Sequence, residues 1–233
     1  YDHHQPGAPV RENGIPYAGF GLIWRHYGET ICGSRAVAER LEERLVIPID
    51  AGDNGVVLAE PTQPPLAPVE LHTIIGSFAP PWRSEQSKDD GFFAAVAFAR
   101  DLLSRLIARE QAALAMDALV AETYAAADDP RIVVVSEPVS ALTAIAYPEV
   151  LLVVCPDDPQ SNENWTATAV RKDHTGFASR VTFPDSWRGL RDADLAAVSE
   201  IPDAVFCHAA GFLFVAGSRA GALAAAAMVA EGK

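Results

Sequence analysis

The feature that most constrains the fold is a long stretch without proline, residues 89–127, that is rich in alanine and leucine. Alanine and leucine are strong helix formers, so we expect a helix far longer than the average of about 11 residues. The Asp-Pro pair at 129–130 ends it, because the residue before proline disfavours the α region. The chain therefore separates into a first domain, residues 1–128, and a second domain, residues 129–233.

Shorter elements are predicted within the first domain. Apolar residues recur with helical spacing from Ser34 to Leu45, and Ser34 is suited to be the N-cap of that helix. The next residues, Val46–Ile49, continue this helix or form a short extended link. They lead to an acidic turn, Asp50–Gly55.

The second domain alternates strands and helices. Four β-branched or alternating runs predict strands, with a helix between the first two; these runs are Ile132–Ser136, Val150–Cys155, Trp165–Arg171 and Ala204–His208. A final helix is predicted at Ser218–Ala230. This mixed order is typical of an α/β domain.

Charge and cysteine content narrow the classes of protein. The 18 basic and 31 acidic residues give a formal net charge of −13, and no cluster of Lys and Arg is present. A protein that binds long nucleic acid through its phosphates needs a basic surface, so we expect a small substrate or cations gathered in one pocket. Three cysteines without CxxC spacing favour a reducing cytoplasm, and no apolar run is long enough to span a bilayer.

Two groups of residues in the first domain have the chemistry of metal ligands. Asp2, His3 and His4 are consecutive, and imidazole with carboxylate suits Mn, Fe, Zn or Co, although a solvated loop has the same composition. Asp50 and Asp53 are followed by glycines that permit sharp turns. This second group is either an oxygen cage or an Asx-rich turn on the surface.

A third group, in the second domain, has the chemistry of phosphate binding. His208 ends a predicted strand and is followed closely by Gly211, and an open α/β sheet presents ligand-binding side chains at its strand ends. Arg219 lies at the start of the last helix, where backbone N–H groups attract anions. Further candidate cations are Arg180, Arg188 and Arg191. The alternative for Arg188 and Arg191 is surface pairing with Asp185, Asp192 and Asp194.

Together these motifs resemble the melanocyte-proliferating-gene family, a branch of the DHH phosphoesterase superfamily with RNA exonuclease members. The resemblance runs over almost the whole chain. It is carried, in chain order, by Tyr1–Gln5, Gly19–Gly28, Ile49–Gly55, Trp165 with Ala169-Val170, Arg180, Phe183–Asp192, Phe206–Phe212 and Gly221–Leu223.

The resemblance implies a two-domain phosphodiesterase. Its first domain would contain a parallel sheet and bind two divalent ions, Mn or Mg, and the long helix would join it to a smaller mixed α/β domain. Asp2 and His3 would be metal ligands, His4 would contact phosphate, and Asp50, or else Asp53, would supply the second carboxylate. Substrate, a nucleotide or short single-stranded RNA, would be held by His208 and Arg188, with Arg180 as a further candidate. The residues themselves add Arg191, Gly211 and Arg219 as candidates for binding substrate.

The family pattern also includes a His-rich motif and a further Asp upstream of the DHH motif. Since this sequence starts at Tyr1, we expect either a longer natural protein or a degenerate relative that binds nucleotides or phosphate without catalysis. A third hypothesis is an interaction domain that forms a homodimer through the helix at 89–127. In the first hypothesis, the metal ligands and the phosphate-binding residues face each other across a cleft.

Overall fold

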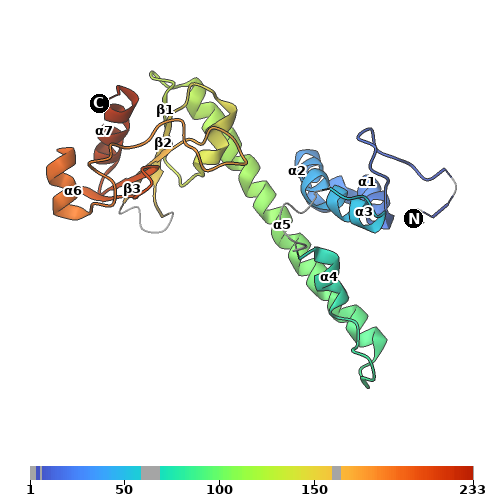
Figure 1. Cartoon of the computed structure of the whole chain (residues 1–233). Helices are drawn as coiled ribbons and strands as arrows, with labels where there is room; N and C mark the ends of the chain where they lie inside the picture. Colours follow the sequence, from blue (N-terminus) through green and yellow to red (C-terminus); the bar gives the residue numbers. More distant parts are fainter. Residues whose placement is uncertain (1–3, 6, 59–68, 159–163, 233) are drawn as a thin grey trace. The chain divides into compact units, whose positions relative to one another are not determined.

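The computed structural model describes residues 4–5, 7–58, 69–158 and 164–232 (Figure 1). Contacts divide the chain into two compact units, Tyr1–Ala112 and Ala113–Lys233. The boundary falls inside helix α5 (Lys88–Ala125), which confirms the long helix predicted at residues 89–127. The predicted domain boundary at residue 128 lies just beyond the end of this helix and stays a prediction. None of the helices in the described ranges is long and apolar enough to cross a membrane.

The first unit is built from helices. They are α1 (Gly19–Cys32), α2 (Arg35–Leu41), the π-helix η1 (Glu42–Val46), α3 (Ile47–Asp53), α4 (Leu71–Gly76) and the first part of α5. Ser34 is the N-cap of α2, as predicted, and its hydroxyl accepts a hydrogen bond from the Val37 N–H at 3.4 Å. Helix α2 continues through η1 into α3, so the residues at 46–49 are helical rather than extended.

The parallel sheet that the resemblance implied for this unit is not found among its described residues. They contain helices and one isolated bridge between Val10 and Pro16. In α1 the buried residues are Gly21, Trp24, Gly28 and Cys32, which recur at a spacing of three or four. That spacing is the period of a helix packed on one side, and it is incompatible with the alternation of a strand.

A buried ion pair connects α3 to the start of α1. Asp50 is fully buried, and its carboxylate accepts hydrogen bonds from the Gly21 N–H at 3.0 Å and from Arg11 Nη2 at 2.7 Å. Ala18, the N-cap position of α1, offers no side-chain acceptor, so Asp50 satisfies one of the N–H groups that a helix start leaves unpaired. A Cβ on Gly21 would lie 1.8 Å from Asp50 Oδ2, so only glycine allows this approach.

Arg11 is held in place from several sides. Its side chain is 6% exposed, its Nε donates to Glu42 Oε1 at 3.0 Å, and its guanidinium lies 3.8 Å from the centre of the Tyr17 ring. Burial lowers the pKa of Arg11, but the hydrogen bonds and charges of Asp50 and Glu42 outweigh this and raise it above the ordinary value. The guanidinium therefore stays charged, and the stretch at 50–53, expected as an acidic turn, is the end of a helix.

The second unit contains a five-stranded mixed sheet. The strands are β1 (Ile132–Val134), β2 (Leu152–Pro156), β3 (Trp165–Ala169), β4 (Ala204–Cys207) and β5 (Leu213–Ala216), in the order β1-β2-β3-β5-β4. β1 and β2 are parallel, and all other pairs are antiparallel. The mixed α/β class and four of the strands are as predicted, whereas β5 and helix α6 (Asp192–Ser199) were not foreseen.

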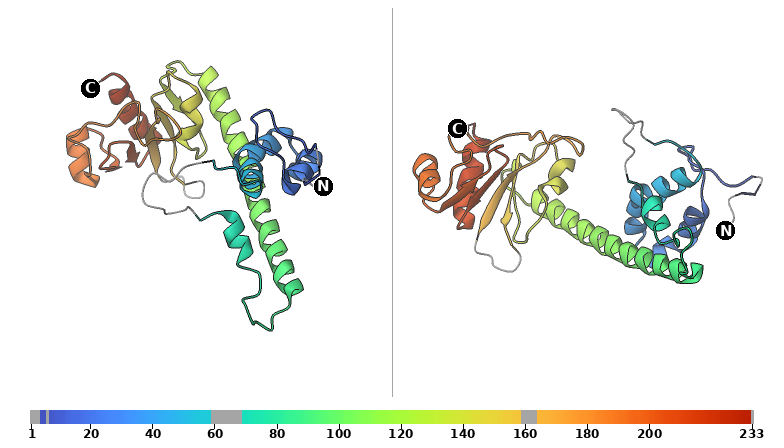
Figure 2. Two further views of the ribbon diagram at one scale, coloured as in Figure 1. Left: turned by 45° about the vertical axis from the view of Figure 1, so that its right-hand side comes forward. Right: turned by 60° about the horizontal axis from the view of Figure 1, so that its bottom comes forward.

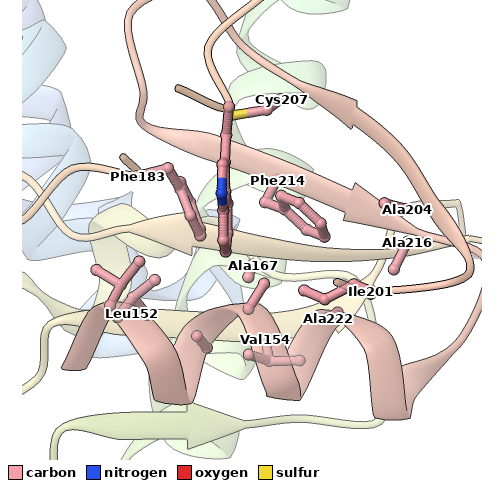
Figure 3. Packing of buried hydrophobic residues seen from close by; sticks show 14 of the residues in the cluster. Leu152, Val154, Ala167, Phe183, Ile201, Ala204, Cys207, Phe214, Ala216 and Ala222 are labelled. Atoms are coloured by element: carbon pink, nitrogen blue, oxygen red, sulfur yellow. The ribbon is translucent and has the colours of Figure 1, made fainter. Parts of the chain in front are cut away.

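The two faces of this sheet are covered differently. Helix α7 (Arg219–Ala230), red in Figure 2, packs on one face, where Leu152 and Val154 of β2 join the core with the alanines of α7. Figure 3 shows Phe183 and Phe214 in this core. Val153 points to the other face, which is covered at β1 and β2 by the end of α5 and by the 3₁₀ helix η2 (Ala141–Ala146).

Replacing Arg11 by alanine would leave the Asp50 carboxylate buried without a cation. We expect a loss of about 3–5 kcal/mol in the free energy of unfolding, measured by urea denaturation, because an uncompensated buried charge is costly. Adding Asp50→Asn should recover part of the loss, since an amide oxygen still accepts from Gly21.

The matched control is Arg35→Ala. Arg35 pairs with Glu39 on the exposed surface of α2, so its removal should leave the denaturation midpoint unchanged. Equal midpoints for the Arg11 and Arg35 variants would contradict the structural role of the buried pair.

Candidate functional site

The candidate site is built on the hairpin that joins β4 to β5. Along β4, Cys207 points into the core and is fully buried, so Phe206 and His208 lie on the opposite face of the strand. The connecting turn is closed by a hydrogen bond of 2.7 Å from the Gly211 N–H to the His208 carbonyl. Gly211 has a φ of 69°, a left-handed conformation that favours glycine.

The side chain of His208 is oriented by this turn. Its Nδ1 lies 3.0 Å from the backbone nitrogen of Ala210, which donates to it. An imidazole nitrogen that accepts a hydrogen bond carries no proton, so the neutral ring has its N–H at Nε2. The ring also packs on Phe212, with ring centres 4.3 Å apart. His208 therefore presents a hydrogen-bond donor from a fixed ring.

Arg188 lies against the same turn. A Cβ on Gly211 would be 2.4 Å from Arg188 Nε, so the guanidinium occupies the space that any other residue at 211 would fill. Nε donates to the Phe183 carbonyl at 3.0 Å, and Nη2 donates to Thr182 Oγ1 at 2.9 Å. Nη1 pairs with Asp185 Oδ1 at 2.6 Å.

These contacts leave capacity for an anion. A guanidinium has five N–H groups, and the three contacts of Arg188 within the described ranges use three of them. The side chain of Asp185 is 87% exposed, so its pairing with Arg188 is a surface ion pair that stabilises little. The alternative predicted for Arg188, pairing with Asp185, is thus observed, but an anion can displace it at low cost. Arg191 instead lies over Phe206, 4.2 Å from the ring centre.

A groove is lined by residues that contact Arg188 and His208. It has a volume of about 640 Å³, and the first residues of η2 are part of its lining. It is lined by Ser140, Ala141, Leu142, Thr168, Ala169, Arg171, Phe177, Ala178, Ser179, Thr182, Ala210 and Phe212. Three of these contact the predicted phosphate residues: Thr182 bonds Arg188, Ala210 bonds His208, and Phe212 packs on His208.

Two of the predicted cations are not brought to this hairpin. Arg180 donates from Nη1 to the carbonyls of Tyr147 and Val150 and from Nη2 to that of Ile145, so it holds η2 to the start of β2. A substrate phosphate would have to compete with these three carbonyls. Strand β5 begins next to the turn and ends at Ala216. Arg219 comes after that end and is the first residue of α7, which packs on the face of the sheet toward which Cys207 points.

The residues predicted to bind metals belong to the first unit. Asp2 and His3 lie outside the described residues, and His4 and Asp53 are exposed. Both carboxylate oxygens of Asp50 already accept hydrogen bonds, one of them from a cation. Within the described ranges, no group of three His, Cys, Asp or Glu side chains is placed to hold a metal ion.

The cysteines lie in the core rather than at the surface of the site. All three are free and buried, in agreement with the sequence. Burial raises the pKa of Cys207, beneath the hairpin, to about 11, although the charge of Arg188 lowers it. Its thiol is therefore protonated at neutral pH, and the thiolate is the reactive form.

Sequence reasoning missed most of the groove. Phe212 is the last residue of the Phe206–Phe212 motif, and Arg171 is the last residue of a predicted strand, so the sequence contains a local signal for both. Phe177 and Thr182 had none, because each reaches the groove through a loop whose path depends on the sheet.

The fold and the site define an α/β protein with a candidate anion-binding site at one hairpin of a mixed sheet. The chain belongs to the MYG1 exonuclease family: the model of that family, described as MYG1_exonuc, uncharacterised protein family UPF0160, matches residues 1–229. The resemblance to this family is therefore confirmed, while membership of the DHH superfamily stays a prediction.

Relatives in distant organisms match over nearly the whole chain. The MYG1 exonuclease of Homo sapiens is 28% identical over 262 residues, which are 97% of this chain and 69% of the human protein. The MYG1 protein of Schizosaccharomyces pombe is 26% identical over 91% of this chain and 74% of its own length. The MYG1 protein of Caenorhabditis elegans is 27% identical over 97% of this chain and 76% of its own length. No solved structure matches the chain.

Substituting Gly211 tests the close approach of Arg188. Gly211→Ala introduces a left-handed alanine and a Cβ that overlaps Arg188, so it should lower the stability of the second unit by more than the roughly 1–2 kcal/mol of backbone strain. The control is Gly189→Ala, because Gly189 has a φ of 78° and open space around its Cβ position. In an Arg188→Ala background, Gly211→Ala and Gly189→Ala should lower the free energy of unfolding by the same amount, as measured by urea denaturation. A difference that persists there would contradict the proposed packing.

Proposed function

We propose that this protein is a phosphodiesterase that shortens RNA or cleaves short nucleotides, and that Arg188 and His208 hold the substrate phosphate. Support comes from mammalian relatives named MYG1 exonuclease and from the chemistry of the hairpin. The observation that carries the proposal is the guanidinium of Arg188, which lies against Gly211 and uses three of its five N–H groups within the described ranges, on the same turn that orients the ring of His208.

The hairpin suits a phosphate for electrostatic reasons. A phosphate oxygen that replaces Asp185 on Nη1 gains a charge-assisted hydrogen bond, which is about twice as strong as a neutral one. The Nε2–H of His208 donates a second bond. Both donors are fixed before the substrate arrives, Arg188 by Phe183 and Thr182 and His208 by Ala210, so little conformational entropy is lost on binding.

The two divalent ions, Mn or Mg, belong to this proposal as an inference from the resemblance. The described residues do not by themselves fit such a centre. Asp50 is paired with Arg11, and a cation bound to the same carboxylate would be repelled by the guanidinium. Metal binding would have to rely on Asp2 and His3, with His4 beside them and Asp53 or Asp50 as the further carboxylate.

The second candidate function is a nucleotide- or phosphate-binding module without catalysis. It is favoured by one observation, the lack of a metal-binding group in the described part of the chain. Such a module would keep the hairpin site of Arg188 and His208 and release its ligand uncleaved. The cytoplasmic location and the homodimer through α5 stay predictions under either function.

Hydrolysis of a labelled single-stranded RNA oligonucleotide by the whole chain, with Mn²⁺ and with EDTA, tests the proposed function. We expect shortening with Mn²⁺ that stops in EDTA. Arg188→Ala should lower kcat/KM by about 10- to 150-fold, since a hydrogen bond to a charged group contributes about 1.5–3 kcal/mol.

Arg219→Ala is the control for loss of charge, because Arg219 is exposed at the other end of β5, and it should hydrolyse RNA like the unaltered chain. Equal losses in the two variants would show that net charge rather than the hairpin binds substrate. Nucleotide binding without any hydrolysis would establish the second candidate function, and hydrolysis that persists in EDTA would exclude the metal ions.

A further inference from the structure

The groove beside the hairpin has the properties of a ligand site. Its volume of about 640 Å³ lies within the range of about 300–1,000 Å³ that is typical of small-molecule pockets. The lining combines the apolar residues Leu142 and Phe212 with the hydroxyl-bearing residues Ser140, Thr168 and Ser179. A mixture of aromatic surface and neutral hydrogen-bonding groups suits a flat heterocycle attached to a sugar.

Phe177 at the edge of this groove is exposed to an unusual degree. The residue is 86% exposed, so a large apolar side chain faces water. The guanidinium of Arg171 lies 4.8 Å from the ring centre. An exposed aromatic ring paired with an arginine offers two planar groups on which a nucleobase can stack.

A small hairpin fixes the position of Phe177. Arg171 and Ser179 form an antiparallel bridge, and the Lys172 N–H donates to the Ala178 carbonyl at 2.9 Å. At the tip, Asp173 Oδ1 accepts hydrogen bonds from the backbone N–H groups of Gly176 and Thr175 and from the Thr175 hydroxyl. These bonds lower the pKa of Asp173, so the tip keeps its hydrogen bonds at neutral pH.

We infer that the groove binds the terminal nucleoside of the substrate, with its base stacked on Phe177 and its phosphate directed to Arg188 and His208. Thr182 connects the two parts, because it lines the groove and bonds Arg188. Recognition by stacking is tolerant of sequence, since every base has a π-face, and that suits an enzyme that removes successive nucleotides. The inference rests on the proposed function for its substrate class.

Calorimetric binding of two probes to the whole chain tests this inference. Adenosine 5′-monophosphate contains a base and ribose 5-phosphate does not, so we expect the nucleotide to bind about 5- to 150-fold more tightly. Phe177→Ala should remove that difference by weakening the nucleotide alone, and Phe177→Trp should keep it. In RNA hydrolysis, Phe177→Ala should raise KM and leave kcat unchanged.

The matched control is Phe93→Ala, which removes another exposed phenylalanine, 66% exposed, from the first unit and should change neither affinity. Equal affinities for the two probes, or a ratio unaffected by Phe177→Ala, would overturn the inference. Failure of this inference can be distinguished from failure of the proposed function. If the chain binds the nucleotide through Phe177 but cleaves no RNA, only the proposed hydrolysis is refuted. If the chain cleaves RNA and Phe177→Ala has no effect, only the binding of the nucleoside in the groove is refuted.

Discussion

The contact on which the candidate site depends is the close approach of Arg188 to Gly211. Because residue 211 has no side chain, the guanidinium can lie against the turn, where it bonds Phe183 and Thr182. The same turn orients His208 through Ala210. Gly211 thus brings the cation to this turn, and Ala210 orients the imidazole there, while Cys207 is buried in the core next to them in the chain.

Elements defined by local pattern could be predicted from the sequence. The long proline-free stretch gave α5, and Ser34 was identified as an N-cap from its type and position alone. Strand β5 could not be found in this way. Its four residues follow directly on the turn at 208–212, and they become a strand through pairing with β3 and β4. The expected parallel sheet came from resemblance rather than from the pattern of α1, which is helical.

The candidate site was foreseen in part. His208 and Gly211 belong to one short sequence motif, and Arg188, 20 residues before His208 and also predicted to bind phosphate, lies against Gly211 in the structure. Arg180 bonds carbonyls 30 to 35 residues away, and Asp50 pairs with Arg11, 39 residues away. Such partners leave no local signal, so an arginine that holds backbone cannot be told by sequence from one that binds phosphate.

The central claim is that the β4–β5 hairpin of the second unit holds the phosphate of a nucleotide. A crystal structure of the whole chain with adenosine 5′-monophosphate tests it most directly. The account predicts phosphate oxygens within hydrogen-bond distance of the Arg188 guanidinium and of His208 Nε2, with Asp185 displaced from the arginine. A nucleotide bound with its phosphate away from both side chains, and with the Arg188–Asp185 pair intact, would contradict it.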